Sequence, residues 1–454
     1  MPEAPWRVFG TKAFFRLWSA QFVSSLGDWI GLIAILAIAA RVSHNSGAAV
    51  SLVMLARVVP GFFLGTIGGV LIDRFDRRKV MVFSDVGRAG LLMVLPFVDG
   101  ILALVLVSLG LEIFTLLWGP AKEASVPHLV STEQLSSANT LSLVASFGTF
   151  PFAAAIFSLL AAVAAWLGSL GLIHAFEVDQ EVLALLVDAC TFIASAIIVW
   201  RLPIPKGKGR TESMGFSETV SEIKQGLSYI AHEPRVRGVI VGLGFGLIGA
   251  GAIIPLGPLY ANAGLGGDSA TYGLLLTAFG IGAAVGVVSL LFFQKKLPRE
   301  SVFDFAVMGA GLCLILTATF TALVPAVLAV ALMGACSGTS YVTGFTVLQE
   351  TVQDDLRGRI FATLYTVIRM CLLVALVISP LWADFWNWLI DDALNVGIVT
   401  IGQVDYSFPG VRIALWGGGL ITLGAGIYAR WSMVHAANKA DGAAASGMAS
   451  DAAA

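Results

Sequence analysis

The sequence predicts an all-α membrane protein of twelve transmembrane helices arranged as two six-helix bundles. Hydrophobic residues make up 57% of the 454 residues and charged residues only 12%, whereas a soluble domain carries roughly 25% charged residues. A soluble fold of this length would leave much apolar surface in water, and lipid is the solvent that tolerates such a surface. Twelve long apolar runs and a one-sided distribution of Lys and Arg support the same fold class.

Each apolar run is long enough to cross a bilayer, which takes about 20 mostly apolar residues. Because lipid offers no hydrogen-bond partners, the backbone of each run must pair internally, as in a helix. Six expected spans precede a central polar stretch, at residues 14–40, 48–72, 80–98, 100–119, 140–165 and 182–202. Six follow it, at residues 236–261, 270–293, 301–320, 322–347, 360–385 and 411–430.

The central polar stretch, residues 203–235, is expected to link the two bundles on the cytoplasmic surface. Its apolar residues recur at steps of four and three, which predicts one face of an amphipathic helix; they are Phe216, Val220, Ile223, Leu227 and Ile230. We therefore expect an N-terminal bundle over residues 1–202 and a C-terminal bundle over residues 236–435. The tail, residues 436–454, is rich in alanine, glycine and serine and is predicted to be disordered.

The placement of basic residues predicts the orientation in the membrane. If the connections are numbered from a cytoplasmic N-terminus, all but five of the 27 Lys and Arg fall in the termini and the even-numbered loops. Arg41 and Arg412 fall on the outer side, and Arg57, Arg88 and Arg369 fall inside spans. This is the positive-inside pattern, so both termini are predicted to be cytoplasmic. The net charge is only −2, and no bulk field indicates a nucleic-acid partner.

The loop between the second and third spans carries the sharpest motif, Gly69-Val-Leu-Ile-Asp73-Arg74-Phe-Asp76-Arg77-Arg78-Lys79. It resembles the major facilitator superfamily, whose signature in this loop is a glycine, an Asp-Arg pair and a basic cluster. Asp76 stands where the general pattern prefers glycine, which is similar to the branch of enterobactin and macrolide exporters, where a D-R-x-D-R-R run is common. The resemblance implies a charge latch between bundle halves, formed by Gly69, Asp73, Arg74, Arg77, Arg78, Lys79, Arg357 and Arg359.

Further motifs of that branch follow in the same order over residues 14–380. They include Gly27-Asp28-Trp29, Asp85 with Arg88, Gly119-Pro120-Ala121 before VPHLV, and QETVQDDLRGRIFA ending at Ala362. The resemblance implies a secondary transporter in which two bundles alternate around a central cavity. It also implies the export of amphipathic compounds such as drugs, macrolides or siderophores. It fades beyond residue 380, where residues 384–410 form a longer outer connection than expected.

Ionisable residues inside the spans are the best pointers to function, because burying a charge in a membrane costs a few kcal/mol even on a lenient scale. The helical rise of about 1.5 Å per residue places Asp28 and Arg57 at one depth, near mid-membrane or slightly outward. It places Arg88 and Glu112 together at a second depth. The candidate residues for substrate binding or proton coupling are Asp28, Arg57, Glu112, Arg88, Asp188 and Arg369.

Each of these residues also has an interpretation as part of a structural ion pair that fixes helix register, and the sequence leaves both interpretations open. If a conformational change made or broke an Asp28–Arg57 pair, the proton affinity of the carboxylate would change with it. Such a pair would couple proton binding to transport.

Several function classes find no support in the motifs. Gly244 to Gly249 matches GxGxxG, but it lies inside an apolar run rather than after a strand, so a dinucleotide site is rejected. There is no GxxxxGK[ST] motif for ATP, and no clustered His, Asp and Glu constellation of a membrane enzyme. The four cysteines lie in apolar runs without metal-ligand spacing and are expected to pack. No metal, cofactor or enzymatic activity is predicted.

The sequence therefore predicts a multi-pass protein of the cell membrane, monomeric, that exchanges protons for small molecules. Three alternatives stay open: a non-transporting receptor or scaffold, an importer, and a lipid transporter of the same fold.

Overall fold

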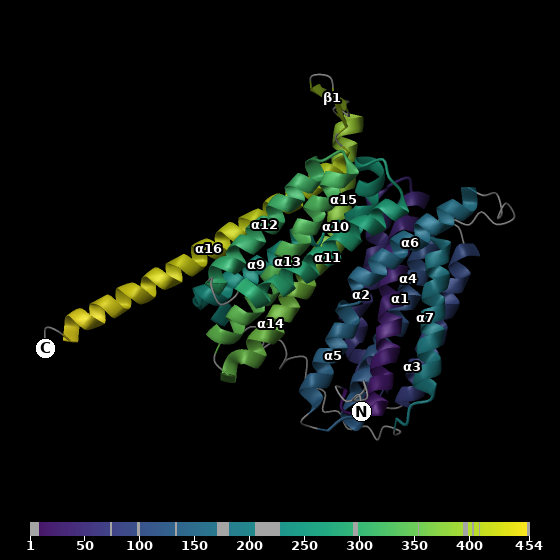
Figure 1. The fold of residues 1–454 in the computed structure, drawn as a ribbon, viewed down its shortest axis with the longest axis horizontal. Coiled ribbons are helices and arrows are strands. Elements are labelled where there is room, and N and C mark those ends of the chain that lie inside the picture. Colours follow the sequence, from purple (N-terminus) through teal and green to yellow (C-terminus); the bar gives the residue numbers. More distant parts are fainter. Residues whose placement is uncertain are drawn as a thin grey trace. The chain divides into compact units, whose positions relative to one another are not determined.

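The chain folds almost entirely into long helices (Figure 1). The computed structural model describes residues 9–72, 75–97, 100–131, 134–169, 181–204, 228–293, 298–352, 354–393, 398–401, 404–407 and 409–451. In this part of the chain, eleven helices are long and apolar enough to cross a membrane. The protein is therefore a multi-pass membrane protein.

In the residues described for the first half of the chain there are seven α-helices and two short 3₁₀ turns. They are α1 (Lys12–Val42), α2 (Gly47–Ile72), α3 (Arg77–Val94), η2 (Leu95–Phe97), α4 (Ile101–Ser125), η3 (Val126–His128), α5 (Leu135–Phe147), α6 (Phe150–Ser169) and α7 (Val182–Trp200). Helix α7 packs against α1 and α3, and α4 packs against α2 and α3. An apolar core that includes Phe14, Leu17 and Met81 joins these helices.

The described residues of the second half form eight α-helices, three short π-helical segments and one hairpin. They are α9 (Pro234–Ala250), α10 (Ile253–Leu259), η5 (Tyr260–Gly264), α11 (Ser269–Phe293), α12 (Arg299–Thr319), α13 (Leu323–Thr351), α14 (Asp354–Leu373), η6 (Val374–Ile378), α15 (Ser379–Asn387), η7 (Trp388–Ala393), β1 (Ile398–Ile401), β2 (Val404–Ser407) and α16 (Gly410–Asp451). Helix α12 packs against α13 and α16, and α16 packs against α9. A second core that includes Val239, Phe303 and Leu364 fills this half.

The structure divides into two compact units. Unit 1 comprises Met1–Glu212 together with Pro258–Thr277, and unit 2 comprises Ser213–Gly257 and Ala278–Ala454. A short segment from the second half of the sequence thus belongs to unit 1. Of the expected linker, residues 203–235, residues 205–227 lie outside the described residues, so the surface helix stays a prediction. Residues 228–232 are helical, and Ile230 packs into the core of the second half.

Every expected span falls on helical structure, but several spans differ in detail. The span expected at 48–72 corresponds to α2, although its described apolar stretch is only Gly47–Gly61. The span expected at 140–165 is two helices, α5 and α6, which meet at Gly148. The span expected at 236–261 breaks at Gly251 into α9 and α10, because glycine favours helix ends and the prolines of α10 cannot donate to the helical ladder.

Two regions beyond residue 380 differ from expectation. The long outer connection at 384–410 contains the end of α15, η7 and an antiparallel β1–β2 hairpin. The tail was expected to be disordered from residue 436, yet α16 continues to Asp451. Alanine has the highest helix propensity of all residues, so an alanine-rich tail extends a helix that membrane packing has already nucleated.

Candidate functional site

A polar cavity of about 350 Å³ lies within unit 1. It opens between helices that contribute both acidic and basic side chains to one apolar environment. Three acids and three bases line it, together with hydroxyl, amide, aromatic and aliphatic groups. The lining residues are Gln21, Ser24, Ser25, Asp28, Trp29, Leu32, Arg57, Arg88, Glu112, Thr115, Trp118, Gly119, Lys122, Glu123 and Ser146.

Arg88 of α3 organises the cavity wall. Its guanidinium donates from Nη1 to Asp28 Oδ2 at 3.1 Å and from Nη2 to Asp85 Oδ1. The Arg88 side chain is 2% exposed, and its guanidinium carbon lies 4.1 Å from the centre of the Phe192 ring. Such a buried cation requires paired, hydrogen-bonded carboxylates. Arg88 therefore binds two carboxylates, one on its own helix and one on α1.

Asp85 is the most completely bound of the carboxylates around Arg88. Its side chain is fully buried, and Oδ2 accepts hydrogen bonds from Ser195 Oγ at 2.8 Å and Trp118 Nε1 at 3.3 Å. Three donors from α3, α4 and α7 thus converge on one carboxylate. Asp85 holds these helices together and fixes Arg88 in place.

Asp28 differs from Asp85 because its side chain remains 30% exposed in the cavity. In the described part of the chain, Arg88 is its only hydrogen-bond donor. The neighbouring residues on α1 position this helix: Trp29 Nε1 donates to Ser146 O at 2.8 Å, and Gln21 Nε2 donates to Ser142 O at 3.0 Å. The Asp28 carboxylate therefore faces the cavity with one side-chain partner, whereas other side chains hold α1 in place.

Asp188 of α7 lies behind the cavity wall. It is 2% exposed and accepts a hydrogen bond from Thr191 Oγ1 at 3.3 Å. It packs where α1 carries Gly27 and Gly31, and a Cβ at either glycine would overlap its carboxylate. Asp188 also interacts electrostatically with Asp28, Arg88 and Arg57.

Arg57 of α2 and Glu112 of α4 are opposite charges on two helices of the cavity. Both are half-buried and line it, and each interacts electrostatically with the other. In the described part of the chain, neither forms a hydrogen bond or an ion pair. Glu112 lies beside Gly61, one helical turn beyond Arg57 on α2.

The structure brings together all of the predicted coupling residues except Arg369, but with different partners. Asp28 pairs with Arg88 rather than with Arg57, and Arg88 pairs with Asp28 and Asp85 rather than with Glu112. Depth along a helix predicts which residues are level, but not which faces meet. Arg369 lies on α14 in unit 2 with an exposed side chain.

Asp85 was not among the predicted site residues, although it stands three positions before Arg88. That spacing puts both side chains on one helical face. An Asp and an Arg three apart inside an apolar run are therefore a signal that the sequence offers for a buried pair.

The predicted latch lies only partly within the described residues. Asp76 is the N-cap of α3 and accepts from the backbone N–H groups of Arg78 at 3.0 Å and Lys79 at 3.4 Å. Arg77 Nη1 donates to Ala124 O at 2.8 Å, near the C-terminus of α4. Asp76 thus starts α3 where the general pattern has glycine. Asp73 and Arg74 lie outside the described residues, as do the side chains of Arg357 and Arg359, so the latch stays a prediction.

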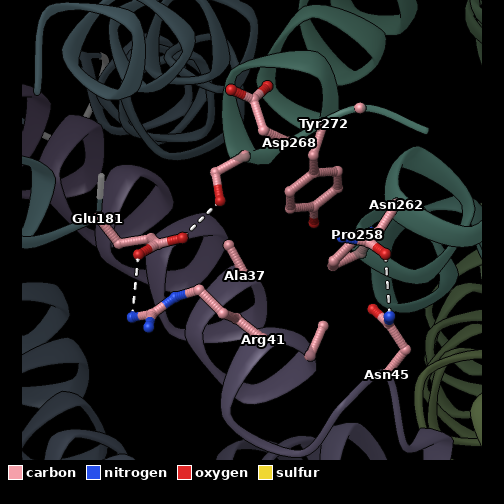
Figure 2. A pocket seen from close by; sticks show the side chains of 11 residues that line it. Ala37, Arg41, Asn45, Glu181, Pro258, Asn262, Asp268 and Tyr272 are labelled. Carbon is pink, nitrogen blue, oxygen red and sulfur yellow. Dashed lines mark hydrogen bonds and ion pairs between the residues drawn. The ribbon is translucent and has the colours of Figure 1, made fainter. Parts of the chain in front are cut away.

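A second pocket in unit 1, of about 320 Å³, surrounds Glu181 (Figure 2). Arg41 Nη2 lies 3.3 Å from Glu181 Oε2, and Ser269 donates a hydrogen bond to Glu181 Oε1. Across the pocket, Asn45 Nδ2 donates to Asn262 Oδ1 at 3.0 Å. These contacts hold the segment Pro258–Thr277 against α1 and the start of α7.

Comparison with known proteins assigns the family. The family model described as "Transmembrane secretion effector", a branch of the major facilitator superfamily, matches residues 3–382. The chain belongs to this family. It is a membrane transporter of small molecules and not an enzyme, and the resemblance inferred from the loop motif is confirmed.

Two curated relatives are exporters by name. The chain is 25% identical to macrolide efflux protein A of Streptococcus pyogenes, over 82% of this chain and 89% of that protein. It is 23% identical to the enterobactin exporter EntS of Salmonella typhimurium, over 76% of this chain and 80% of that protein.

A solved structure has the same fold. A bacterial homologue of the human lysosomal transporter Spinster superposes with a TM-score of 0.66 at 15% identity, over 94% of this chain and 96% of that chain. Residues beyond 382, including the β1–β2 hairpin, lie outside the match to the family model.

Proposed function

We propose that this chain exports small amphipathic molecules such as drugs, macrolides or siderophores in exchange for protons, by alternating access. The observation that carries the proposal is the cavity of unit 1. There Arg88 binds two carboxylates, the partly exposed one of Asp28 and the fully buried one of Asp85. The apolar ring faces of Trp29 and Trp118 in the same cavity suit an amphipathic guest. Outward transport is supported by the relatives named as a macrolide efflux protein and an enterobactin exporter.

Proton coupling would act at Asp28. Because Asp28 has one donor and is open to the cavity, a proton or a substrate can displace Arg88 from it while Asp85 keeps Arg88 paired. Membrane carboxylates that face a water-filled cavity are recurrent parts of proton relays. In this exchange Asp85 keeps its contact with Arg88, and Asp28 loses or regains its own.

The proposal includes a topology of twelve spans in the cell membrane, with both termini in the cytoplasm and the monomer as the working unit. The positive-inside distribution of Lys and Arg supports this orientation. An even number of spans follows from it.

The test is an accumulation assay in cells with and without the protein, using a panel of drugs, macrolides and siderophores. Expressing cells should accumulate less of at least one compound, and a protonophore should abolish the difference. Asp28→Asn should abolish it as well, whereas Arg201→Gln, at the exposed C-cap of α7, should not. Greater accumulation in expressing cells would indicate an importer. Protonophore-sensitive export by Asp28→Asn would remove Asp28 from the mechanism.

A further inference from the structure

Two opposite charges on different helices of the cavity indicate which substrates it selects. Arg88 is committed to Asp85 and Asp28, and Lys122 and Glu123, which also line the cavity, are adjacent on α4, so their side chains leave that helix in different directions. Arg57 and Glu112 lie on two helices, α2 and α4, line the same cavity and form no ion pair with each other or, in the described part of the chain, with any other residue.

A guanidinium and a carboxylate that face one cavity without contact are costly in an apolar environment, because each has lost part of its hydration. Arg57 and Glu112 attract each other electrostatically but do not form an ion pair. A ligand that offers an anion to Arg57 and a cation to Glu112 would satisfy both charges at once. A ligand with a single charge would satisfy one and leave the other without a partner.

We propose that the substrate is a zwitterionic amphiphile, whose carboxylate binds Arg57, whose ammonium binds Glu112, and whose apolar end lies toward Trp29 and Leu32. The proposal rests on the proposed function only in taking this cavity as the substrate site. It assigns charge selectivity to α2 and α4, whereas Asp28 and Arg88 serve proton coupling. Both charged residues therefore act as specificity-determining residues for export.

The geometry favours the joint recognition of both charges. Gly61 places α2 against α4, with the carboxylate of Glu112 and the side chain of Leu116 as the nearest atoms to its Cβ position. Arg57 is one turn away on the same face of α2. An amino-acid head group holds an ammonium and a carboxylate on one carbon, which matches a carboxylate and a guanidinium on two helices that line one cavity. Guanidinium groups favour carboxylates because two N–H donors match two oxygens.

The experiment uses three probes that differ in the charge of the amino-acid head group and carry the same fluorescent apolar end. They are Nε-dansyl-lysine as the zwitterion, its methyl ester as the cation, and its Nα-acetyl derivative as the anion. Binding to the purified full-length protein is followed by dansyl fluorescence. The zwitterion should bind at least about tenfold more tightly than either derivative, because each charged contact contributes roughly that factor.

The variants should lose selectivity in opposite ways. Arg57→Gln should bind the zwitterion and the ester equally, because the carboxylate no longer has a partner. Glu112→Gln should bind the zwitterion and the acetyl derivative equally, because the ammonium no longer has one. Arg201→Gln should keep the full preference. A generally damaged cavity would weaken all three probes together and would not produce this crossed pattern.

Other results overturn the proposal. Equal binding of the three probes, tighter binding of the ester, or no binding of the zwitterion at millimolar concentration would each exclude zwitterion recognition. Failure here is distinguishable from failure of the exporter proposal. Protonophore-sensitive export of a cationic drug would support the exporter proposal and contradict zwitterion recognition. The crossed binding pattern without export would support zwitterion recognition and contradict the exporter proposal.

Discussion

At the scale of single residues, the environment separates two carboxylates that share one guanidinium. Asp85 is fully buried and receives hydrogen bonds from three side chains, whereas Asp28 is 30% exposed and receives one. The first carboxylate therefore fixes Arg88, and the second is the one to which we assign proton coupling in our proposal.

The first prediction concerns the stability that Asp85 provides. Asp85→Asn leaves Arg88 buried with its main counter-charge removed, and breaking a buried pair in this way costs about 3–5 kcal/mol. The melting temperature of the purified protein in detergent should fall clearly. Asp28→Asn should lower it less, because Asp28 is partly solvated. Equal losses for the two variants would contradict the division of roles.

Single residues also explain the two outer exceptions to the positive-inside pattern. Arg41 pairs with Glu181 at 3.3 Å. Arg412 is buried, and its Nη1 lies 3.4 Å from the carbonyl oxygens of Ala318 and Thr319 at the end of α12. A helix C-terminus attracts cations. Both arginines therefore have structural partners that outweigh the general bias of basic residues toward the cytoplasm.

At the scale of elements, glycines set the distance between helices. Gly27 and Gly31 of α1 admit the Asp188 carboxylate of α7. Helix α11 packs closely on α13 at Gly282 and Gly286, since a Cβ at either position would overlap the backbone of α13. Small residues at four-residue spacing are used in this way where helices meet in lipid.

The second prediction tests the packing of α1 against α7. A Cβ at Gly31 would meet only Asp188 among its nearest atoms, so Gly31→Ala should destabilise the protein by about 1–3 kcal/mol through overpacking. In an Asp188→Ala background the same substitution should cost much less, as thermal melting in detergent would measure.

Gly90 provides the matched control for this experiment. It lies on α3, and a Cβ there would meet nothing within 4 Å, so Gly90→Ala should be neutral or slightly stabilising. If Gly31→Ala costs the same with and without Asp188, the contact between the two residues is not what sets the helix distance.

The third prediction concerns the segment that Glu181 holds. Glu181→Ala removes the acceptor for Arg41 and Ser269, so Pro258–Thr277 should open more often. In a background without native cysteines, Ala261→Cys is buried and should react slowly with a polar maleimide. Adding Glu181→Ala should speed that reaction several-fold in permeabilised cells.

The adjacent exposed residue supplies the control. Ala263→Cys should react quickly whether or not Glu181 is present. If Ala261→Cys reacts at the same rate in both backgrounds, Glu181 does not hold the segment closed.

At the scale of the whole molecule, α11 connects the two units. Its first residues, to Thr277, belong to unit 1, and the rest belong to unit 2. The contacts of Glu181 with Arg41 and Ser269 hold the part of this segment that belongs to unit 1.

The sequence predicted the helices well and the site in part. Hydropathy and length place the spans because lipid forces the backbone of an apolar run to pair internally. Burial cost singled out Asp28, Arg57, Arg88, Glu112 and Asp188. Their pairing depends on helix rotation and on which helices are neighbours, and linear spacing encodes neither. The Asp85–Arg88 pair could have been found from its spacing.

The last prediction decides whether α2 crosses the membrane, on which the twelve-span topology depends. Its 26 residues span about 39 Å, which exceeds the hydrocarbon thickness of about 30 Å. His44 and Lys79 lie on either side of α2 and are both exposed, so single cysteines there form a matched pair. In intact cells, an impermeant maleimide should label His44→Cys and spare Lys79→Cys, and permeabilisation should make Lys79→Cys reactive. If both are labelled from the same side, α2 does not cross. The number of spans would then be odd, and the two termini would lie on opposite sides of the membrane.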